Sequence, residues 1–465
     1  MPFRAEQVLS VAQMRAAEEE LMDAGTSVHV LMQRAGRGAA EYVWRLAAHR
    51  PVTVLCGPGN NGGDGYVIAE AIRARGGTVR VIAVADPATD AARYARELYQ
   101  DKVWAPHEAP TGDVLVDCLF GSGLARPLSD DTAALLCDLA ARHHHTIAID
   151  LPSGVQSDAG EPLNPGLPSC DLTIALGAWK YAHFLMPAAA FMGHLRLVEI
   201  GVAPVDGAAK LIGPPRLTAP AADDHKYRRG LLAVIGGEMP GAARLAAIAA
   251  QGAGAGYVKL LASTADGPDD LVSDARLLAE ALGDKRIAAL LVGPGLGRTA
   301  DARSRLAEAL AADLPTVLDA DGLALLGTRQ LAERNAPIIA APHEGELLAL
   351  ESTFGLSGSG SKLDRASALA QASGMVVVAK GPDTVIAAPD GRAALARRAS
   401  SWLSVAGTGD VLAGTIASRL ANRSPAFEAA CEGVWLHGAA ARIAAAPFTA
   451  SVLAQAMPRA YAATL

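Results

Sequence analysis

The sequence predicts an α/β protein made of two three-layer α/β/α domains. Short β-branched runs alternate with alanine-rich helical stretches along the whole chain, which is typical of parallel α/β architecture. The apolar runs are nearly continuous, as expected for strands that are covered by helices on both faces. Glycine-rich segments follow several of these runs directly, at the strand ends where open α/β sheets bind ligands.

Composition argues against several other classes of protein. The 465 residues are 51% hydrophobic and 19% charged, so most of the chain is expected to fold. Lys and Arg total 41 and Asp and Glu total 48, a net charge of −7. Because nucleic-acid affinity needs clustered cations, we expect no nucleic-acid partner. The longest uncharged run, Ile443–Pro458, is shorter than the roughly 20 apolar residues of a membrane span, so no membrane association is expected.

The beginning of the chain and the cysteines bear on the cellular compartment. Residues 1–7 lack the basic start and apolar core of a secretory signal. The cysteines are scattered and never in CxxC spacing, which disfavours a disulfide framework or a zinc site. We therefore expect a cytoplasmic protein. The three adjacent histidines at 143–145 are expected at an exposed helix end rather than in a metal site.

Strands are expected in both halves of the chain. In the first half they are Val52–Cys56, Thr78–Val84, Val114–Cys118, Thr146–Asp150, Asp171–Leu176 and Leu195–Ile200. In the second half they are Leu231–Ile235, Tyr257–Leu261, Ala288–Val292, Thr316–Asp319, Ile338–Ala341, Met375–Lys380 and Thr384–Ala387. The intervening segment Gly213–Ala222 is rich in proline, which indicates a linker. We therefore place one domain at residues 1–214 and a second at 215–465.

The segment Gly57–Gly65 follows the first strand and opens a helix. Its five glycines allow positive φ angles and close approach of the backbone to a ligand. The helix that follows offers free N–H groups, which suit a diphosphate. The segment is neither the GxGxxG fingerprint nor a Walker loop, because no Lys-Ser/Thr follows. The alternative is an unusual strand–helix turn.

Two further loops in the first half carry carboxylates at strand ends. Asp117 begins the loop 117–127 and Asp150 begins the loop 150–154. Each aspartate alone could be a capping residue. Together with the asparagine-rich segment they make a set of oxygen ligands that suits a monovalent cation. Lys180 follows the fifth strand and could reach the same crevice, although a lone lysine is usually a surface residue.

In the second half, Gly407–Asp410 precedes a helical run. A glycine loop on a helix N-terminus forms an anion hole for a transferring phosphoryl group. An aspartate at its end can take a proton from an attacking hydroxyl, although helix capping is the alternative reading of so short a motif. Further motifs at strand–loop junctions are Gly293–Gly297, Pro342–Glu346 and Lys380–Thr384, and His225–Gly230 enters the first strand of this half.

The motifs GPGNNGGDG, DCLFGSGLARP and DLPSG resemble the N-terminal domain of the bifunctional NAD(P)H-hydrate repair enzymes. The resemblance implies a Rossmann-like domain that interconverts the R and S epimers of hydrated NADH or NADPH. It implies a potassium ion at Asn61, Asp117 and Ser153, and Asp150 as the acid–base group with Lys180 as its helper. The hydrate would bind Asn60, Asn61, Gly62, Gly63, Asp64, Gly121, Ser122, Gly123, Leu124, Ala125, Arg126 and Pro127. Ser122 stands where the family often has threonine, which keeps the hydroxyl.

The motifs HKYxRG, GPGLG, PHxGE, KGxxT and GTGD resemble the ribokinase-like, ADP- or ATP-dependent NAD(P)H-hydrate dehydratases. The resemblance implies that a phosphoryl group activates the C6 hydroxyl of the S-hydrate and that loss of phosphate restores the nicotinamide. Asp410 would be the general base, and Mg²⁺ would accompany the nucleotide. The hydrate would contact Gly295, His343 and Asp410, and the nucleotide would contact Lys380, Gly381, Pro382, Asp383, Thr384 and Gly409. Two departures are a glutamate in Pro342–Glu346 where proline is usual and an alanine in Asp319–Ala324 where asparagine is frequent.

The sequence therefore predicts a bifunctional repair enzyme, an epimerase joined to a dehydratase, acting as a homo-oligomer on hydrated NADH or NADPH and an adenine nucleotide. A small-molecule kinase with an accessory nucleotide-binding N-terminal domain is the alternative enzyme. A non-enzymatic alternative makes the first domain a sensing or partner-binding module, since its site is rich in ligands and poor in obvious catalysts.

Overall fold

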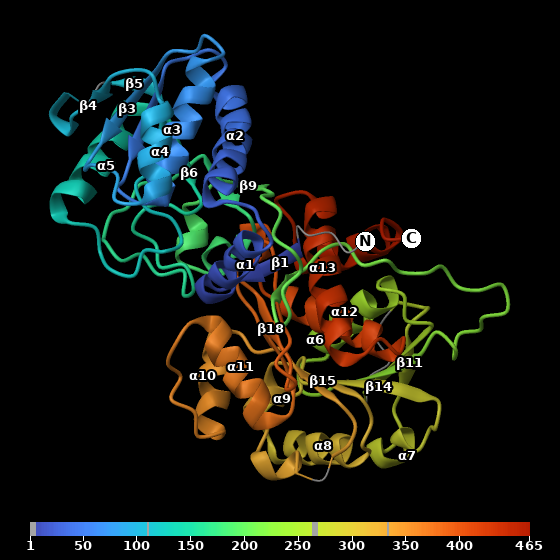
Figure 1. Ribbon diagram of the computed structural model, residues 1–465. Helices are drawn as coiled ribbons and strands as arrows, with labels where there is room; N and C mark the ends of the chain where they lie inside the picture. The colour runs from blue at the N-terminus through green and yellow to red at the C-terminus, as the bar shows by residue number, and fades with distance from the viewer. Residues whose placement is uncertain (1–5, 109–110, 263–267, 333) are drawn as a thin grey trace. The chain divides into compact units, whose positions relative to one another are not determined.

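Parallel strands alternate with helices in both halves of the chain, which confirms the predicted α/β class. The computed structural model describes residues 6–108, 111–262, 268–332 and 334–465. The start of the chain, on which the secretory-signal prediction rests, lies mostly outside these residues. The chain divides into two compact units, Met1–Lys210 and Leu211–Leu465, and each is considered by itself (Figure 1).

Unit 1 is built on a parallel sheet with the strand order β4-β3-β2-β5-β6-β7-β9. Its strands are β2 (Val52–Cys56), β3 (Val79–Ala83), β4 (Val103–Trp104), β5 (Gly112–Cys118), β6 (His143–Ile149), β7 (Leu172–Leu176) and β9 (His194–Val198). Its helices are α1 (Val11–Asp23), α2 (Val28–Ala47), α3 (Asn60–Arg73), α4 (Asp90–Leu98) and α5 (Asp130–Arg142). A small additional ladder joins β1 (Gln7–Leu9) to β8 (Trp179–Lys180) and β10 (Ala209–Leu211).

The strands of unit 1 alternate their side chains between two apolar layers. Val54 of β2 and Val116 of β5 belong to the layer that contains α2 and α3, whereas Leu55 and Leu115 belong to the layer that contains α5. Figure 1 shows α2, α3 and α4 packed together, with α5 across the strands from them. Both faces are thus covered, which explains the continuous apolar runs.

Unit 2 also has a mostly parallel sheet, ordered β13-β12-β11-β14-β15-β16-β17, and β18 and β19 then pair antiparallel. The strands are β11 (Leu231–Ile235), β12 (Tyr257–Leu261), β13 (Val272–Asp274), β14 (Ile287–Val292), β15 (Thr316–Leu318), β16 (Ile338–Ala340), β17 (Val376–Ala379), β18 (Val385–Ala387) and β19 (Ala393–Leu395). The helices are α6 (Pro240–Gly252), α7 (Leu278–Leu282), α8 (Ala300–Ala311), α9 (Asp321–Ala324), α10 (Glu344–Thr353), α11 (Lys362–Ser373), α12 (Thr408–Ala421), α13 (Ala426–Ala444) and α14 (Ala450–Ala462).

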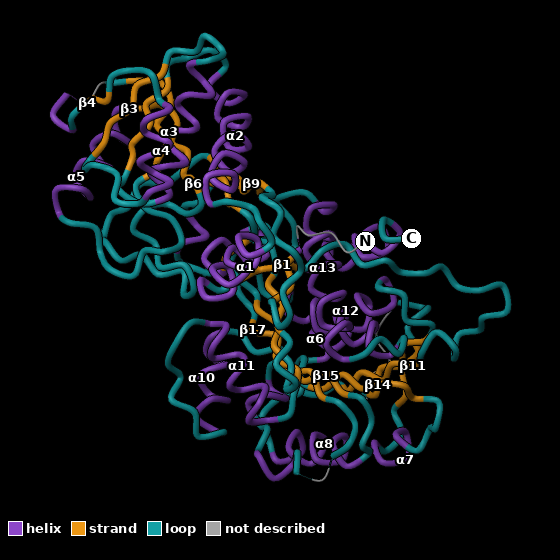
Figure 2. Tube along the Cα trace, in the orientation of Figure 1, coloured by secondary structure: helices purple, strands orange, loops and turns teal. Residues whose placement is uncertain are grey.

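Small residues let the helices of unit 2 pack closely. A Cβ atom at Gly414 of α12 would lie 2.0 Å from the carbonyl oxygen of Ala246 in α6. The facing surfaces are mostly alanine, including the fully buried Ala243, Ala247 and Ala417. Figure 2 shows α6 and α12 beside the strands β11, β14 and β15, with α7 and α8 across them. The alanine-rich composition therefore serves helix–helix and helix–sheet packing.

The prediction for the histidines at 143–145 is right in part. His143 is the C-cap residue of α5, as expected of a helix end, but the three histidines also begin β6, and His143 is buried, with Nδ1 2.7 Å from the Leu139 carbonyl and Nε2 2.9 Å from the Thr53 hydroxyl. Burial lowers the pKa of His143. The short strands β1, β4, β8, β10, β13 and β19 were not expected from the sequence, because two or three residues carry no periodic signal. Within the described residues, no helix is both long and apolar enough to cross a bilayer.

Candidate functional sites

The N-terminus of α3 offers backbone donors in unit 1. Gly59 is the N-cap residue and has no side chain to cap the helix, so the amides of the first turn stay available to an anion. Asn60 and Asn61 begin this turn, and Asp64 follows one turn later, buried. Asn60 is itself held in place, because its side-chain oxygen accepts a 2.6 Å hydrogen bond from the Thr89 hydroxyl.

The glycines of Gly57–Gly65 do not have the positive φ angles that the sequence suggested. They are instead required by packing. A Cβ at Gly57 would lie 1.9 Å from the Leu119 carbonyl oxygen, and a Cβ at Gly65 would lie 2.7 Å from the Cys56 sulfur. Only Gly59 among the five has nothing within 4 Å of such an atom. Four of these five glycines therefore allow close packing of the loop and of α3 against neighbouring segments.

Asp150 lies at the end of β6 in an uncommon backbone conformation. Its φ is +65°, and the Leu151 amide donates to the Ile149 carbonyl at 2.9 Å, which makes a γ-turn of the strained, positive-φ kind. Gly177 makes the same turn after the neighbouring β7, with φ +76°. A glycine would adopt this conformation without strain, so an aspartate here indicates that its side chain is needed.

The Asp150 side chain is paired with Lys180, as the sequence suggested. Lys180 Nζ lies 2.5 Å from Asp150 Oδ1 and also donates to the Leu176 carbonyl at 2.6 Å. Asp150 Oδ2 accepts a 2.8 Å bond from the Ser122 amide. Burial disfavours the charge, yet the Lys180 ammonium and these hydrogen bonds outweigh it and lower the pKa of Asp150. The carboxylate is therefore ionised at neutral pH.

Two other carboxyl groups near this pair have the opposite tendency. Burial, followed by the charges of Asp150 and Glu18, raises the pKa of Asp64 well above its ordinary value. Burial likewise raises the pKa of Glu18 on α1. The other residue that α1 brings close is Arg15, whose guanidinium would lie 3.7 Å from a Cβ at Gly123. Arg15 and Glu18 were not predicted from the sequence, because no motif connects α1 with the loops that follow β5 and β6.

The residues predicted to bind potassium fit a cation in part. Asp117 and Ser153 are together, with the Ser153 amide and hydroxyl donating to the carboxylate at 2.9 and 2.7 Å. These hydrogen bonds alone would satisfy the polar side chains of Asp117 and Ser153, without a bound cation. Asn61 is different, because its buried side-chain oxygen and nitrogen have no hydrogen-bond partner. Such an orphaned group is expected to face a water or an ion, so the Asn61 oxygen suits a cation ligand.

The loop after β5 contributes its backbone more than its side chains. A Cβ at Gly121 would lie 2.8 Å from Asp150 Oδ2 and 3.4 Å from the Asn61 side-chain oxygen, so both polar groups converge on this glycine. Ser122 contributes its backbone amide, which donates to Asp150 Oδ2. Leu124 is half-buried, and the remaining predicted contacts, Gly123, Ala125, Arg126 and Pro127, are exposed.

In unit 2 the ends of β15 and β17 bring a second aspartate–lysine pair together. Lys380 Nζ lies 2.5 Å from Asp319 Oδ1 and 3.8 Å from Glu346. A Cβ at Gly409 would lie 3.8 Å from Lys380 Nζ and 4.0 Å from Asp319. The pair therefore lies beside the N-terminus of α12, whose N-cap Gly407 has φ +91° and no capping side chain. Asp319 was not among the predicted site residues.

Asp410 occupies the first turn of α12. Burial, followed by the charge of Asp319, raises the pKa of Asp410 to about 6, against the lowering effect of Lys380. Buried His437 lies beneath this loop, with Nε2 3.0 Å from the Thr408 carbonyl, and burial lowers its pKa to about 4. A carboxylate with a pKa near neutrality, beside free helix amides, can accept a proton while the amides hold an anion.

The other predicted residues of unit 2 have different local surroundings. Gly295 packs on the loop before α6, where its Cβ would lie 2.1 Å from the Met239 carbonyl. His343 is exposed, and its ring caps α10 by accepting from the Gly345 and Glu346 amides. The Thr384 hydroxyl donates to the Gly381 carbonyl at 2.8 Å and shapes the turn after Lys380. Pro382 is exposed, and Asp383 is buried in an ion pair with Lys362.

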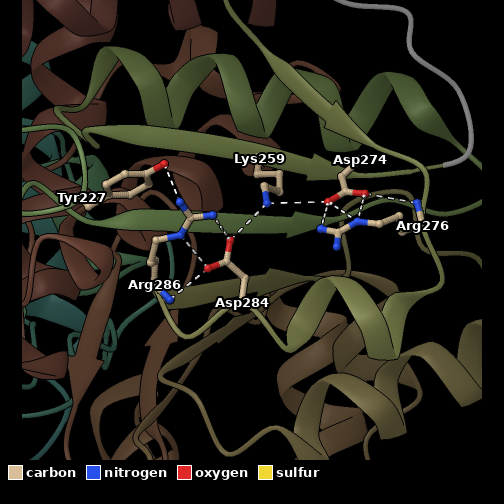
Figure 3. Close-up of polar contacts among 6 residues, drawn as sticks. All are labelled: Tyr227, Lys259, Asp274, Arg276, Asp284 and Arg286. Atoms are coloured by element: carbon tan, nitrogen blue, oxygen red, sulfur yellow. Dashed lines mark hydrogen bonds and ion pairs between the residues drawn. The ribbon is translucent and has the colours of Figure 1, made fainter.

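A further buried cation, Lys259 of β12, belongs to a different cluster (Figure 3). Its Nζ lies 3.6 Å from Asp274 and 3.4 Å from Asp284, and these carboxylates also pair with Arg276 and Arg286. The hydrogen bond from Arg276 lowers the pKa of Asp274 to about 2. Figure 3 shows these hydrogen bonds and ion pairs as a continuous chain that ends at Tyr227, whose hydroxyl accepts from Arg286. These ion pairs link β12 to β13 and to the segment before β14 at one edge of the sheet.

Each α/β unit thus places an aspartate–lysine pair near an uncapped helix N-terminus, an arrangement that suits the binding of an anionic ligand. Residues 28–182 match the family described as YjeF-related protein N-terminus, and residues 232–461 match the NAD(P)H-hydrate dehydratase family.

Curated relatives match nearly the whole chain. The bifunctional NAD(P)H-hydrate repair enzyme of Gloeobacter violaceus is 33% identical over 95% of this chain and 94% of its own. That of Mycobacterium leprae is 33% identical over 94% of each. The chain belongs to the family of bifunctional NAD(P)H-hydrate repair enzymes. Among solved structures, the ADP/ATP-dependent NAD(P)H-hydrate dehydratase of Bacillus subtilis, crystallised with ATP and Mg²⁺, is 27% identical and covers 54% of this chain and 95% of its own, with a TM-score of 0.46.

Proposed function

We propose that the two units divide the repair of hydrated NADH and NADPH between them. The domain at residues 1–214 interconverts the R and S hydrates, and the domain at 215–465 returns the S-hydrate to the reduced nicotinamide at the expense of ADP or ATP. Asp410 carries the proposal: it is a carboxylate with a pKa of about 6 in the first turn of an uncapped helix.

In the second domain Asp410 accepts the proton of the C6 hydroxyl as that oxygen attacks the terminal phosphorus of the nucleotide. The amides around Gly409 and the Lys380 ammonium face the phosphoryl charge. Cleavage of the C6–O bond then releases phosphate, and loss of the neighbouring ring proton restores the double bond. The nucleotide enters as its Mg²⁺ complex, since Mg²⁺ is usually held through substrate phosphates. Gly381, Pro382, Asp383 and Thr384 line the nucleotide, and Gly295 and His343 the hydrate.

In the first domain we assign Asp150 as the acid–base group and Lys180 as the cation that keeps it charged. The α3 amides and the loop 121–127 bind the hydrate. The orphaned Asn61 oxygen supports a potassium site completed by Asp117 and Ser153. A bound potassium ion would supply positive charge for the phosphates of the hydrate. We also propose a cytoplasmic homo-oligomer, which fractionation and sedimentation of the native protein test.

One experiment separates this function from its alternatives. An equal mixture of both NADH-hydrate epimers is supplied with ADP, Mg²⁺ and K⁺, and the absorbance of the reduced nicotinamide is followed. Complete recovery is expected from both activities together. Recovery that stops near half would leave the dehydratase alone and favour a binding role for unit 1. A stable phosphorylated product without recovery would favour the small-molecule kinase.

A further inference from the structure

His183 is a buried histidine of unit 1 that belongs to none of the motifs above. It is 2% exposed and lies in the short turn that follows β8. Trp179 packs edge-on against its ring at 5.5 Å between centroids. Both ring nitrogens are engaged, one with the backbone of Lys180 and the other with the backbone of Asp150.

The hydrogen bonds fix the tautomer of this ring. The Asp150 carbonyl can only accept, so Nε2 carries the proton and donates to it at 2.8 Å. In a neutral ring Nδ1 is then unprotonated and accepts the 2.9 Å bond from the Lys180 amide, although the Lys180 carbonyl also lies 3.1 Å from Nδ1. Burial, followed by the Lys180 charge, lowers the pKa of His183 to about 4, so the ring stays neutral at physiological pH.

These contacts join the two residues whose side chains form the ion pair. Asp150 is held at φ +65°, a conformation that persists only where its surroundings impose it. A hydrogen bond to the carbonyl of that same residue resists relaxation of the turn. We propose that His183 is a positioning residue for the epimerase. Its neutral ring links the Asp150 carbonyl to the Lys180 backbone and thereby holds the strained Asp150 turn in place. The inference rests on the catalytic assignment of Asp150 and Lys180.

The test compares three substitutions in the full-length chain. His183→Phe removes both polar contacts and keeps a ring, His183→Gln keeps a donor for the Asp150 carbonyl, and His183→Asn has too short a side chain to reach it. Conversion of pure R-hydrate to S-hydrate is measured by chromatography. We expect kcat to fall by at least about 10-fold in His183→Phe with KM within about threefold, because small misplacements of reacting groups are costly. His183→Gln is expected to recover most of this loss and His183→Asn little.

His143 supplies the matched control. It is also buried in unit 1 with both ring nitrogens engaged, but it lies at the beginning of β6, the opposite end of the strand from Asp150. His143→Phe is expected to lower stability while leaving the kcat of the folded protein within about twofold. Dehydration of pure S-hydrate by unit 2 reports the concentration of intact chain in every variant.

The outcomes separate the inference from its premise. If Asp150→Asn epimerises at a near-normal rate, the catalytic assignment fails and the inference fails with it. If Asp150→Asn is inactive and folded His183→Phe keeps kcat within about threefold, His183 has no positioning role. Equal losses of kcat in His183→Phe and His143→Phe would also overturn it. If His183→Phe does not fold, the kcat values of the other two variants decide. A higher kcat in His183→Gln than in His183→Asn supports the inference, and equal kcat values refute it.

Discussion

Each unit places an aspartate–lysine ion pair at the ends of parallel strands, yet the pKa of the aspartate is shifted in opposite directions. The nitrogen–oxygen distance is 2.5 Å in both Lys180–Asp150 and Lys380–Asp319. In unit 1 the lysine and an amide donor outweigh burial, and the pKa of Asp150 is lowered. In unit 2 burial prevails and the pKa of Asp319 is raised, with Glu346 adding negative charge nearby.

The difference shows that an ion pair alone does not decide which carboxylate reacts. In unit 1 the candidate acid–base group is the paired aspartate itself, Asp150, whose pKa is lowered. In unit 2 the candidate base is the neighbouring Asp410, whose pKa of about 6 reflects burial and the adjacent Asp319 charge. The distance within the pair does not set the direction of the pKa shift. Both carboxylates accept hydrogen bonds from a lysine and from a backbone amide, but the charge of Glu346 additionally raises the pKa of Asp319. The following predictions test this contrast.

Removal of the Asp410 carboxylate should have the largest effect. Asp410→Asn keeps the shape of the first turn of α12 but cannot accept a proton, so dehydration of the S-hydrate should fall by about 10²–10⁴-fold. Nucleotide binding, measured by calorimetry, should change little. Asp301→Asn, at an exposed position in the first turn of α8, is the control and should keep full activity. Near-normal turnover of Asp410→Asn would exclude Asp410 as the base.

Breaking the unit 1 pair should destabilise the protein more than removing it. Asp150→Asn leaves the Lys180 ammonium, 1% exposed, without its carboxylate, which typically costs about 3–5 kcal/mol. The double variant Asp150→Asn/Lys180→Met removes the stranded charge and should regain most of that stability. The free energy of unfolding of unit 1, measured with denaturant, is compared between the parent chain and these variants. Additive losses in the double variant would mean that the two residues do not stabilise each other.

The glycines of α3 offer a matched pair of substitutions. Gly65→Ser places an atom against Cys56 and Cys118 and should cost about 1–3 kcal/mol of unfolding free energy. Gly59→Ser points into open space at an N-cap, where serine is favoured, and should be neutral or slightly stabilising. Helix propensity alone would favour serine at position 65 as well. Thermal or denaturant unfolding distinguishes the two explanations, since stabilisation by Gly65→Ser would contradict the packing argument.

The smallest effect concerns the pH profile of the dehydratase. Asp410 acts as a base only when it is deprotonated, so kcat/KM should decline as pH falls through about 6. Because the Asp319 charge raises the pKa of Asp410, Asp319→Asn should move this acid limb to lower pH. Lys380→Met should move it to higher pH, because Lys380 lowers the same pKa. Shifts of the same sign in both variants would contradict the charge arrangement, and Asp301→Asn should shift nothing.

Much of this arrangement could be predicted from the sequence. The longer strands of both sheets, the loops after them, the nearness of Lys180 to Asp150 and the position of Asp410 in a helical first turn follow from apolar runs and from residues adjacent in the chain. The short edge strands could not be predicted, because their pairing partners and not their own residues define them. The glycines of Gly57–Gly65 were assigned a conformational role, whereas neighbours such as Leu119 and Cys118 impose their packing role.

The sequence by itself determined the fold class and which loops carry chemistry, because hydrophobic periodicity and glycine content are local properties. The tertiary structure alone decided in which direction the pKa of each buried carboxyl group is shifted. Asp150 and Lys180 lie 30 positions apart and Asp319 and Lys380 lie 61 apart. His183, Glu18 and Arg15 reach the first site from elements that carry no motif. Burial and nearby charges shift the pKa values of His183 and Glu18, and both effects depend on neighbours that only the folded chain brings together.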